Sequence, residues 1–204
     1  MNFNFNVSEL IFVMPELFLL AAVSCILLFD LYVKEELKKF TYHLSQLALL
    51  ITGLLAFNLI GESATIFSGT FVLDTLGSTF KVFIAGFSII ALVYSRHYLS
   101  VHGLLRNEYF ILALMSILGM LVMVSGHSLL TLYLGLEIMS LSLYALIATA
   151  RDRAFAIEAA LKYFVLGAIA SGLLLYGMSM IYGITGNLVI AQIASFASLA
   201  TLEP

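Results

Sequence analysis

The sequence contains few charged residues and a single cysteine, and both shortages exclude whole classes of protein. Only 10% of its 204 residues are Asp, Glu, Lys or Arg, whereas 62% are hydrophobic and the mean hydropathy is +1.10. A soluble domain carries far more charge, so the composition indicates an integral membrane protein. One cysteine, Cys25, cannot supply a disulfide framework or a thiolate site for a metal or an iron–sulfur cluster.

The sequence also lacks the motifs of an enzyme that acts alone and of a nucleic-acid-binding protein. It has no nucleophile–base pair, metal cluster or glycine-rich phosphate loop. The formal net charge of -3 is small, so no nucleic-acid partner is expected. Residues 1–9 contain no Lys or Arg, and the apolar run that follows is too long for a signal peptide. We therefore expect that run to remain as a membrane anchor.

Long apolar runs are what the sequence has in abundance. A helix of ~20 apolar residues, at ~1.5 Å each, crosses the ~30 Å hydrocarbon core of a bilayer. Continuous runs of this length predict an all-α membrane protein with about six transmembrane helices in a single transmembrane domain, residues 1–204. The predicted spans are 10–33, 41–60, 77–99, 107–125, 127–149 and 155–183. Residues 187–204 are too polar for a seventh span and predict an amphipathic helix on the outer surface.

The basic residues outside these spans are distributed asymmetrically. All of them follow odd-numbered spans: Lys34, Lys38, Lys39, Arg96, Arg106, Arg151 and Arg153. Loops rich in Lys and Arg stay on the cytoplasmic side. The pattern predicts a protein of the bacterial plasma membrane or the mitochondrial inner membrane, with its basic loops on the cytoplasmic or matrix side and its N-terminus outward.

Glu137 lies in the middle of the apolar run from Leu129 to Ala148. An ionisable side chain at the centre of such a helix costs roughly 2.5–3.5 kcal/mol on insertion scales. A carboxylate kept at that cost is a candidate for ion or proton handling, because it can load and release a proton as a charged partner moves.

Two lysines also lie inside the predicted spans. Counted from the inner ends, Glu137 is ~18 Å deep and Lys81 ~22 Å deep, so these depths are compatible with an ion pair. Lys162 is only ~10 Å deep, and Glu158 precedes it by four positions, the favourable order for a helical ion pair. That pair either neutralises itself near the inner membrane face or takes part in a proton path, and the residues leave both readings open.

Other polar and small residues in the spans are assigned structural roles. Glu16, ~9 Å into the first span from outside, pairs across helices or reaches the headgroups. Asp30 and Asp74, near span ends, are expected to be solvated or to cap helices. Small residues spaced by four on the last span predict close helix packing: Gly167 with Ser171, and Ala168 with Gly172.

Several stretches, taken together and in order, resemble a known family. Residues 132–141 read LYLGLEIMSL around Glu137, residues 158–164 read EAALKYF, and residues 171–177 read SGLLLYG. With Pro-Glu-Leu at 15–17 and Phe-Lys at 80–81, this order resembles the antiporter-like membrane subunits of NADH:quinone oxidoreductase (respiratory complex I). Within that family the resemblance is to subunit N, the counterpart of mitochondrial subunit 2.

The resemblance implies a proton-translocating subunit of a membrane arm, with no redox centre of its own. By this similarity Glu137 is the key glutamate of the proton pathway, Glu158 and Lys162 match its acidic and basic positions, and Lys81 matches a further lysine. The expected partners are the other membrane-arm subunits and the lipid bilayer. NADH, flavin, iron–sulfur clusters and quinone are expected in partner subunits, so that quinone acts on this chain only indirectly.

Members of that family are more than twice as long and contain two inverted repeats with broken helices. The resemblance therefore covers the N-terminal part of an antiporter-like inverted-repeat fold, without the lysine expected to face Glu137. The sequence is then either a fragment or the product of a split gene. Two other functions stay open: a subunit of a multi-subunit cation/proton antiporter, and a membrane scaffold subunit that conducts nothing.

Overall fold

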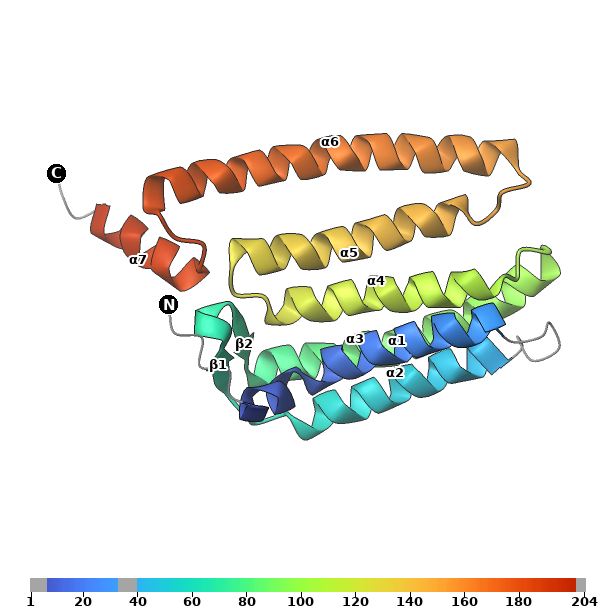
Figure 1. The fold of residues 1–204 in the computed structure, drawn as a ribbon, viewed down its shortest axis with the longest axis horizontal. Coiled ribbons are helices and arrows are strands. Elements are labelled where there is room, and N and C mark those ends of the chain that lie inside the picture. The colour runs from blue at the N-terminus through green and yellow to red at the C-terminus, as the bar shows by residue number, and fades with distance from the viewer. Residues whose placement is uncertain (1–6, 33–39, 201–204) are drawn as a thin grey trace.

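The structure is a computed structural model, and it describes residues 7–32 and 40–200. In chain order its elements are η1 (Val7–Val13), α1 (Met14–Tyr32), α2 (Phe40–Asn58), β1 (Ala64–Ile66), η2 (Phe67–Gly69), β2 (Phe71–Leu73), α3 (Thr75–Val101), α4 (Asn107–Ser125), α5 (Leu129–Ala148), α6 (Ala154–Thr185) and α7 (Ile190–Ala200). The helices α1 to α6 run alternately up and down along one direction (Figure 1).

Six helical segments, α1 with part of η1 and α2 to α6, are long and apolar enough to cross a membrane. Helices form there because a backbone in hydrocarbon has no water to bond, and a helix satisfies its N–H and C=O groups internally. Polar side chains mark where helices begin. Asp74 caps α3 by accepting a hydrogen bond from Gly77 N at 2.6 Å, and Ser128 caps α5 in the same way. The predicted all-α fold with six transmembrane helices is confirmed.

A small β-hairpin lies between α2 and α3, in the connection between the second and third predicted spans. Strands β1 and β2 are antiparallel, and Ile66 pairs with Phe71. Two turn residues, Phe67 and Ser68, have positive φ angles of 52° and 57°. Strands of three residues are too short to show an alternating pattern of apolar and polar residues. The hairpin therefore escapes sequence analysis.

The hairpin closes one end of the helix bundle, together with the turn between α4 and α5. Phe71 forms a bridge with Gly126, and His127 N donates to Thr70 O at 2.9 Å. The segment before α7 joins the same end, because Leu129 N donates to Leu188 O at 2.9 Å. We call this the hairpin end. The loops from α3 to α4 and from α5 to α6 lie at the opposite end (Figure 1).

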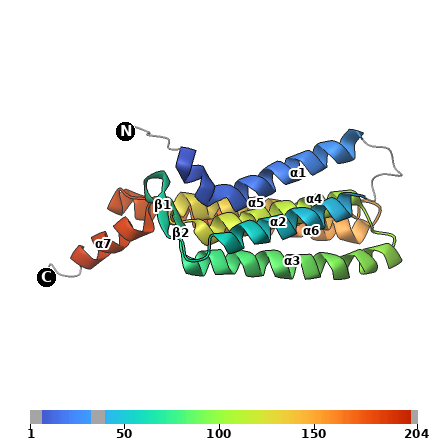
Figure 2. The same ribbon diagram turned by 90° about the horizontal axis from the view of Figure 1, so that it is seen from below.

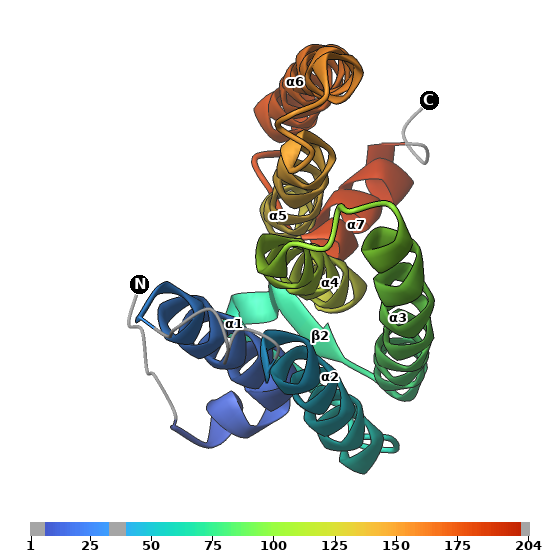
Figure 3. The same cartoon turned by 90° about the vertical axis from the view of Figure 1, so that its right-hand side faces the viewer.

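The apolar core lies among α1, α2, α3 and α4, with α4 next to all of the others. Helix α6 lies at the outside of the bundle and packs on α5, as the view along the helices shows (Figure 3). Ala160 is its only buried residue within the part of the chain that the structure describes. Helices α1 to α5 therefore form the body of the bundle, and α6 presents most of its apolar surface outward.

The loop end opposite the hairpin gathers the described basic residues of the loops. Arg106 pairs with Asp152 at 2.8 Å, and Arg151 pairs with Glu108 at 2.9 Å. The predicted basic residues Lys34, Lys38 and Lys39 lie outside the described residues. The orientation of this end toward the cytoplasm or matrix stays a prediction, as does the outer-surface position of 187–204, where α7 forms.

Candidate functional site

Helix α5, which carries Glu137, packs on α4 through a very close helix contact. Gly119 of α4 and Gly135 of α5 face each other, and a Cβ atom at Gly119 would lie 2.6 Å from Gly135 O and from Met139 N. Only hydrogen at these positions lets the two backbones approach so closely. Glu137 is two residues from this contact and is half-buried.

Among the described residues, the Glu137 carboxylate is bonded by a hydroxyl group and not by a cation. Ser171 of α6 donates a hydrogen bond to Glu137 Oε1. The same Ser171 hydroxyl bonds to the Tyr133 hydroxyl, at 3.0 Å. Because Tyr133 and Glu137 are four residues apart, they lie on one face of α5 and hold Ser171 between them. Tyr133, Ser171 and Glu137 form a continuous chain of protonatable oxygen atoms between α5 and α6, which we call the hydroxyl chain.

Sequence analysis gave Ser171 only a packing role, and the structure shows that the packing is what positions it. Gly167, one turn earlier on α6, lies against the Tyr144 ring of α5, so a Cβ there would overlap the ring. The other pair of small residues behaves differently, because a Cβ at Gly172 would meet nothing within 4 Å. Only the stripe containing Gly167 and Ser171 faces α5. Which of two stripes faces a neighbour depends on the rotation of α6, which spacing alone does not give.

Glu158 and Lys162 form the predicted ion pair on α6, with Lys162 Nζ 2.5 Å from Glu158 Oε1. Their side chains are 62% and 70% exposed in the described part of the chain. Neither residue bonds to Glu137 among the described residues. The structure therefore keeps this pair apart from the hydroxyl chain, and it lies near the loop end of α6.

The ion pair suggested between Lys81 and Glu137 is a wrong prediction, because Lys81 pairs with Glu16 of α1 instead. Lys81 Nζ lies 2.5 Å from Glu16 Oε1, and the two side chains are 0% and 5% exposed. The depths were counted from the inner ends. Counted from the hairpin end, Lys81 is six residues into α3, or about 9 Å, and Glu16 is also ~9 Å into the predicted first span, which begins at residue 10. The sequence signal for this pair was that Glu16 and Lys81 lie at similar depths when both are counted from the hairpin end.

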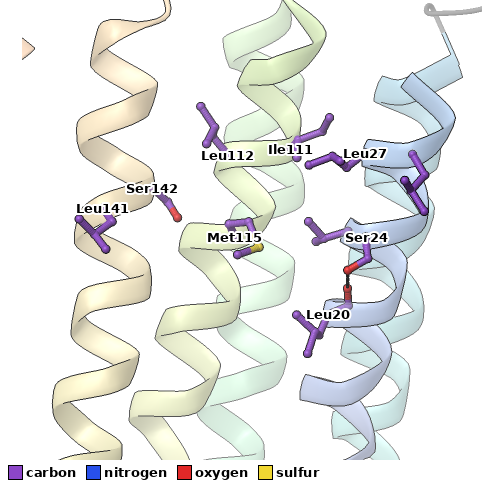
Figure 4. A pocket seen from close by; sticks show the side chains of 10 residues that line it. Leu20, Ser24, Leu27, Ile111, Leu112, Met115, Leu141 and Ser142 are labelled. Atoms are coloured by element: carbon purple, nitrogen blue, oxygen red, sulfur yellow. Dashed lines mark hydrogen bonds between the residues drawn. The ribbon is translucent and has the colours of Figure 1, made fainter. Parts of the chain in front are cut away.

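A groove along the helices offers no further site for a polar ligand. It has a volume of about 600 Å³ and lies between α1, α4 and α5 (Figure 4). Its two serines are both engaged within their own helices, since Ser24 donates to Leu20 O and Ser142 to Ile138 O. The remaining lining side chains are apolar. Among the described residues, no group of three or more His, Cys, Asp or Glu side chains could hold a metal ion.

A protein family matches the segment that contains the three residues of the hydroxyl chain. A family model described as "NADH:quinone oxidoreductase/Mrp antiporter, TM" matches residues 126–203. The span includes Glu137, Ser171 and the pair Glu158–Lys162, and it excludes Glu16 and Lys81.

A curated relative covers nearly all of the chain. NADH-quinone oxidoreductase subunit N of Ruthia magnifica subsp. Calyptogena magnifica is 65% identical over 200 residues, which is 98% of this chain and 41% of the relative. The chain thus spans about two fifths of the length of the curated relatives it matches.

Two solved structures share the fold. Respiratory complex I from Thermus thermophilus with bound aureothin contains a chain that is 28% identical, with a TM-score of 0.71; the match covers 86% of this chain and 38% of that one. The membrane-bound sulfane sulfur reductase, an archaeal respiratory membrane complex, contains a chain with a TM-score of 0.77 and 25% identity, over 91% of this chain and 40% of that one. The antiporter-like fold expected from the sequence is confirmed.

Proposed function

Because this chain belongs, over the length that it spans, to the family of NADH-quinone oxidoreductase subunit N, we propose that it is a membrane-arm subunit that moves protons through Glu137. In this proposal the electrons pass from NADH to quinone through flavin and iron–sulfur clusters of partner subunits. The chain itself holds none of these groups. Its partners are the other membrane-arm subunits and the surrounding lipid.

The observation that carries the proposal is the carboxylate of Glu137, half-buried between apolar helices and bonded to the Ser171 hydroxyl. A charge in such a place is costly, and no cation among the described residues lies within ion-pair distance of it. An intramembrane carboxylate is by default a candidate for ion or proton handling. It is therefore suited to alternate between a charged and a neutral state.

The hydroxyl chain gives the proton a route to and from the carboxylate. Ser171 donates its single hydroxyl proton to the ionised Glu137, so its oxygen accepts a hydrogen bond from the Tyr133 hydroxyl. When Glu137 is protonated, its O–H can donate to Ser171 instead, and the hydroxyl groups reverse direction. One proton moves along the chain when water supplies a proton to Tyr133, the Tyr133 proton passes to Ser171 and the Ser171 proton passes to Glu137, so that each hydroxyl that loses a proton gains another.

The remaining charged residues are assigned supporting roles in the same proposal. Glu158 and Lys162 lie near the loop end of α6, where they can supply protons to the route or receive them. The exposed surface of α6 implies that this pair faces another part of the complex. Lys81 acts near the hairpin end. The basic loops lie on the cytoplasmic or matrix side, by the excess of Lys and Arg there.

The driving force in this proposal comes from outside the chain. Moving one proton against 100 mV requires ~2.3 kcal/mol. The sequence has no motif for ATP or NADH, so quinone reduction in partner subunits has to change the charge near Glu137. This requirement favours a subunit of a large complex over a transporter that acts alone.

The test is Glu137→Gln, introduced into the native gene and assayed in inverted membrane vesicles. We expect NADH-driven acidification to be lost while the complex assembles and oxidises NADH with an artificial acceptor at its normal rate. Glu62→Gln is the matched control, because it removes the same carboxylate from an exposed turn after α2. Unchanged acidification in Glu137→Gln would leave a non-conducting scaffold as the function.

Co-purification separates the proposal from a cation/proton antiporter. The matched family model covers both kinds of protein by its description, so the fold does not distinguish them. We expect flavin and iron–sulfur proteins to co-purify with this chain from detergent-solubilised membranes. Recovery with other antiporter subunits and without flavin would contradict the proposal.

A further inference from the structure

The ion pair between Glu16 and Lys81 is the most deeply buried charged group in the described part of the chain. Glu16 lies in the first turn of α1 and Lys81 in the second turn of α3. In the view of Figure 2, α1 runs close to α3 at the hairpin end and away from it toward the other end. The pair lies where the two helices converge. The Phe71 ring of β2 covers it, with its centre 5.1 Å from Lys81 Nζ.

The two charged groups satisfy little of each other's bonding capacity. An ammonium group has three donors, and a carboxylate has about four acceptor positions. Beyond their mutual contact, neither Lys81 Nζ nor either Glu16 carboxylate oxygen has a hydrogen-bond partner on a third residue in residues 7–32 and 40–200. Buried polar groups are normally hydrogen-bonded. The free positions on both partners are therefore available to a water molecule or to another proton carrier.

A purely structural role explains this pair poorly. Replacing a buried ion pair by well-packed apolar side chains is often neutral or stabilising, because removing two charges from water offsets their attraction. The neighbouring core of α1 to α4 is apolar and packs without ions. Two opposite charges at this point therefore point to a use that apolar side chains cannot serve.

We infer that Glu16 and Lys81 form a second proton-exchange site, distinct from the hydroxyl chain at Glu137. The step is a transfer from Lys81 Nζ to Glu16 Oε1: one N–H bond breaks, one O–H bond forms, and the charged pair becomes a neutral amine and a neutral carboxylic acid. The total charge is zero before and after, and no electron moves. The acid then passes its proton to water at the hairpin end, and the amine takes another proton from water within the protein.

The two sites belong to different parts of the fold. Helix α4 separates α1 and α3 from α5 and α6 in the view along the helices (Figure 3). The family model that covers Glu137 begins at residue 126, so the pair Glu16–Lys81 lies outside the matched segment. This inference rests on the proposed function, since an exchange site is useful only in a protein that moves protons. It adds an acid, Glu16, that the sequence gave a structural role.

The decisive variant is Lys81→Arg, made in the native gene and assayed in the intact membrane complex. Arg keeps the positive charge and the contact with Glu16, but its guanidinium does not release a proton in proteins. A second variant, Glu16→Gln with Lys81→Met, removes both charges and keeps similar volumes. Glu16→Asp keeps an acid and serves as the conservative control.

We expect Lys81→Arg and the double neutral variant to assemble and to oxidise NADH normally with an artificial acceptor. Both should lose NADH-driven acidification, and Glu16→Asp should keep it. Normal acidification in the double neutral variant would overturn the inference and leave a structural ion pair. If Lys81→Arg fails to assemble, the double neutral variant still decides.

Infrared difference spectra of the complex during turnover give a readout that a structural role would not change. Besides the band of protonated Glu137, a second carboxylic acid band should appear in the unmodified complex and be absent from the double neutral variant, in which Glu16 is replaced. Absence of that second band from the unmodified complex would contradict the transfer to Glu16. Glu137→Gln, measured in the same series, separates the proposed proton path through Glu137 from the second exchange site at Glu16 and Lys81. If it abolishes acidification while the double neutral variant pumps normally, only the second site is wrong.

Discussion

Removing one partner of the buried pair Glu16–Lys81 should destabilise the protein far more than removing both. At 2.5 Å and an effective dielectric constant of ~20, the attraction is about 7 kcal/mol. The loss of water by two ions offsets most of it, at several kcal/mol per ion. Lys81→Met leaves the Glu16 charge buried alone, and we expect it to cost about 3–5 kcal/mol. Glu16→Gln should cost a similar amount, and the double variant much less than the sum.

Thermal unfolding of the purified protein in detergent measures this difference. For a chain of this length, 1 kcal/mol shifts Tm by about 2–4 °C, so each single variant should unfold roughly 6–20 °C lower than the parent. The double variant should recover most of that loss. Single variants within about 2 °C of the parent, or a double variant that loses the sum of both shifts, would refute a buried ion pair at this position.

Two further predictions concern contacts that hold the helices together. Gly119→Ala should lower stability by about 1–3 kcal/mol, because its Cβ would lie 2.6 Å from backbone atoms of α5. Gly172→Ala should be neutral or slightly stabilising in the same thermal assay, because its Cβ would meet nothing within 4 Å. Asp30→Ala should cost about 1.5–3 kcal/mol, because Asp30 Oδ1 accepts hydrogen bonds from Thr41 at 2.9 Å and Asn107 at 2.7 Å and so joins three helices. Unchanged unfolding of Asp30→Ala would contradict that role.

The six helices could be predicted from the sequence because hydropathy and length decide whether a segment crosses a membrane. Polar residues between the runs also mark where helices begin, as Asp74 and Ser128 show at α3 and α5. The hairpin was missed because strands of three residues, Ala64–Ile66 and Phe71–Leu73, give no periodic signal. Hydropathy therefore predicts the fold class but not the structure of short connections.

The partners of the candidate site residues were harder to predict. A helix that is apolar all round gives no indication of which face meets its neighbour, so Ser171 and Tyr133 could not be assigned to Glu137. The ion pair on α6 was predictable, since Glu158 and Lys162 are one turn apart on a single helix. Lys81 was first matched with Glu137 by depth alone. Depth leaves the rotation and lateral position of a helix undetermined, and these bring Lys81 to Glu16.

The most direct test of the central claim is the number of protons moved per NADH oxidised in the Glu137→Gln complex, with Glu137→Asp alongside. If Glu137 carries protons, the Gln variant moves fewer protons per NADH at an unchanged rate of electron transfer to an artificial acceptor. The Asp variant keeps part of the proton-to-NADH ratio of the unmodified complex. Gln cannot exchange a proton, whereas Asp can. An unchanged ratio in the Gln variant would contradict the account.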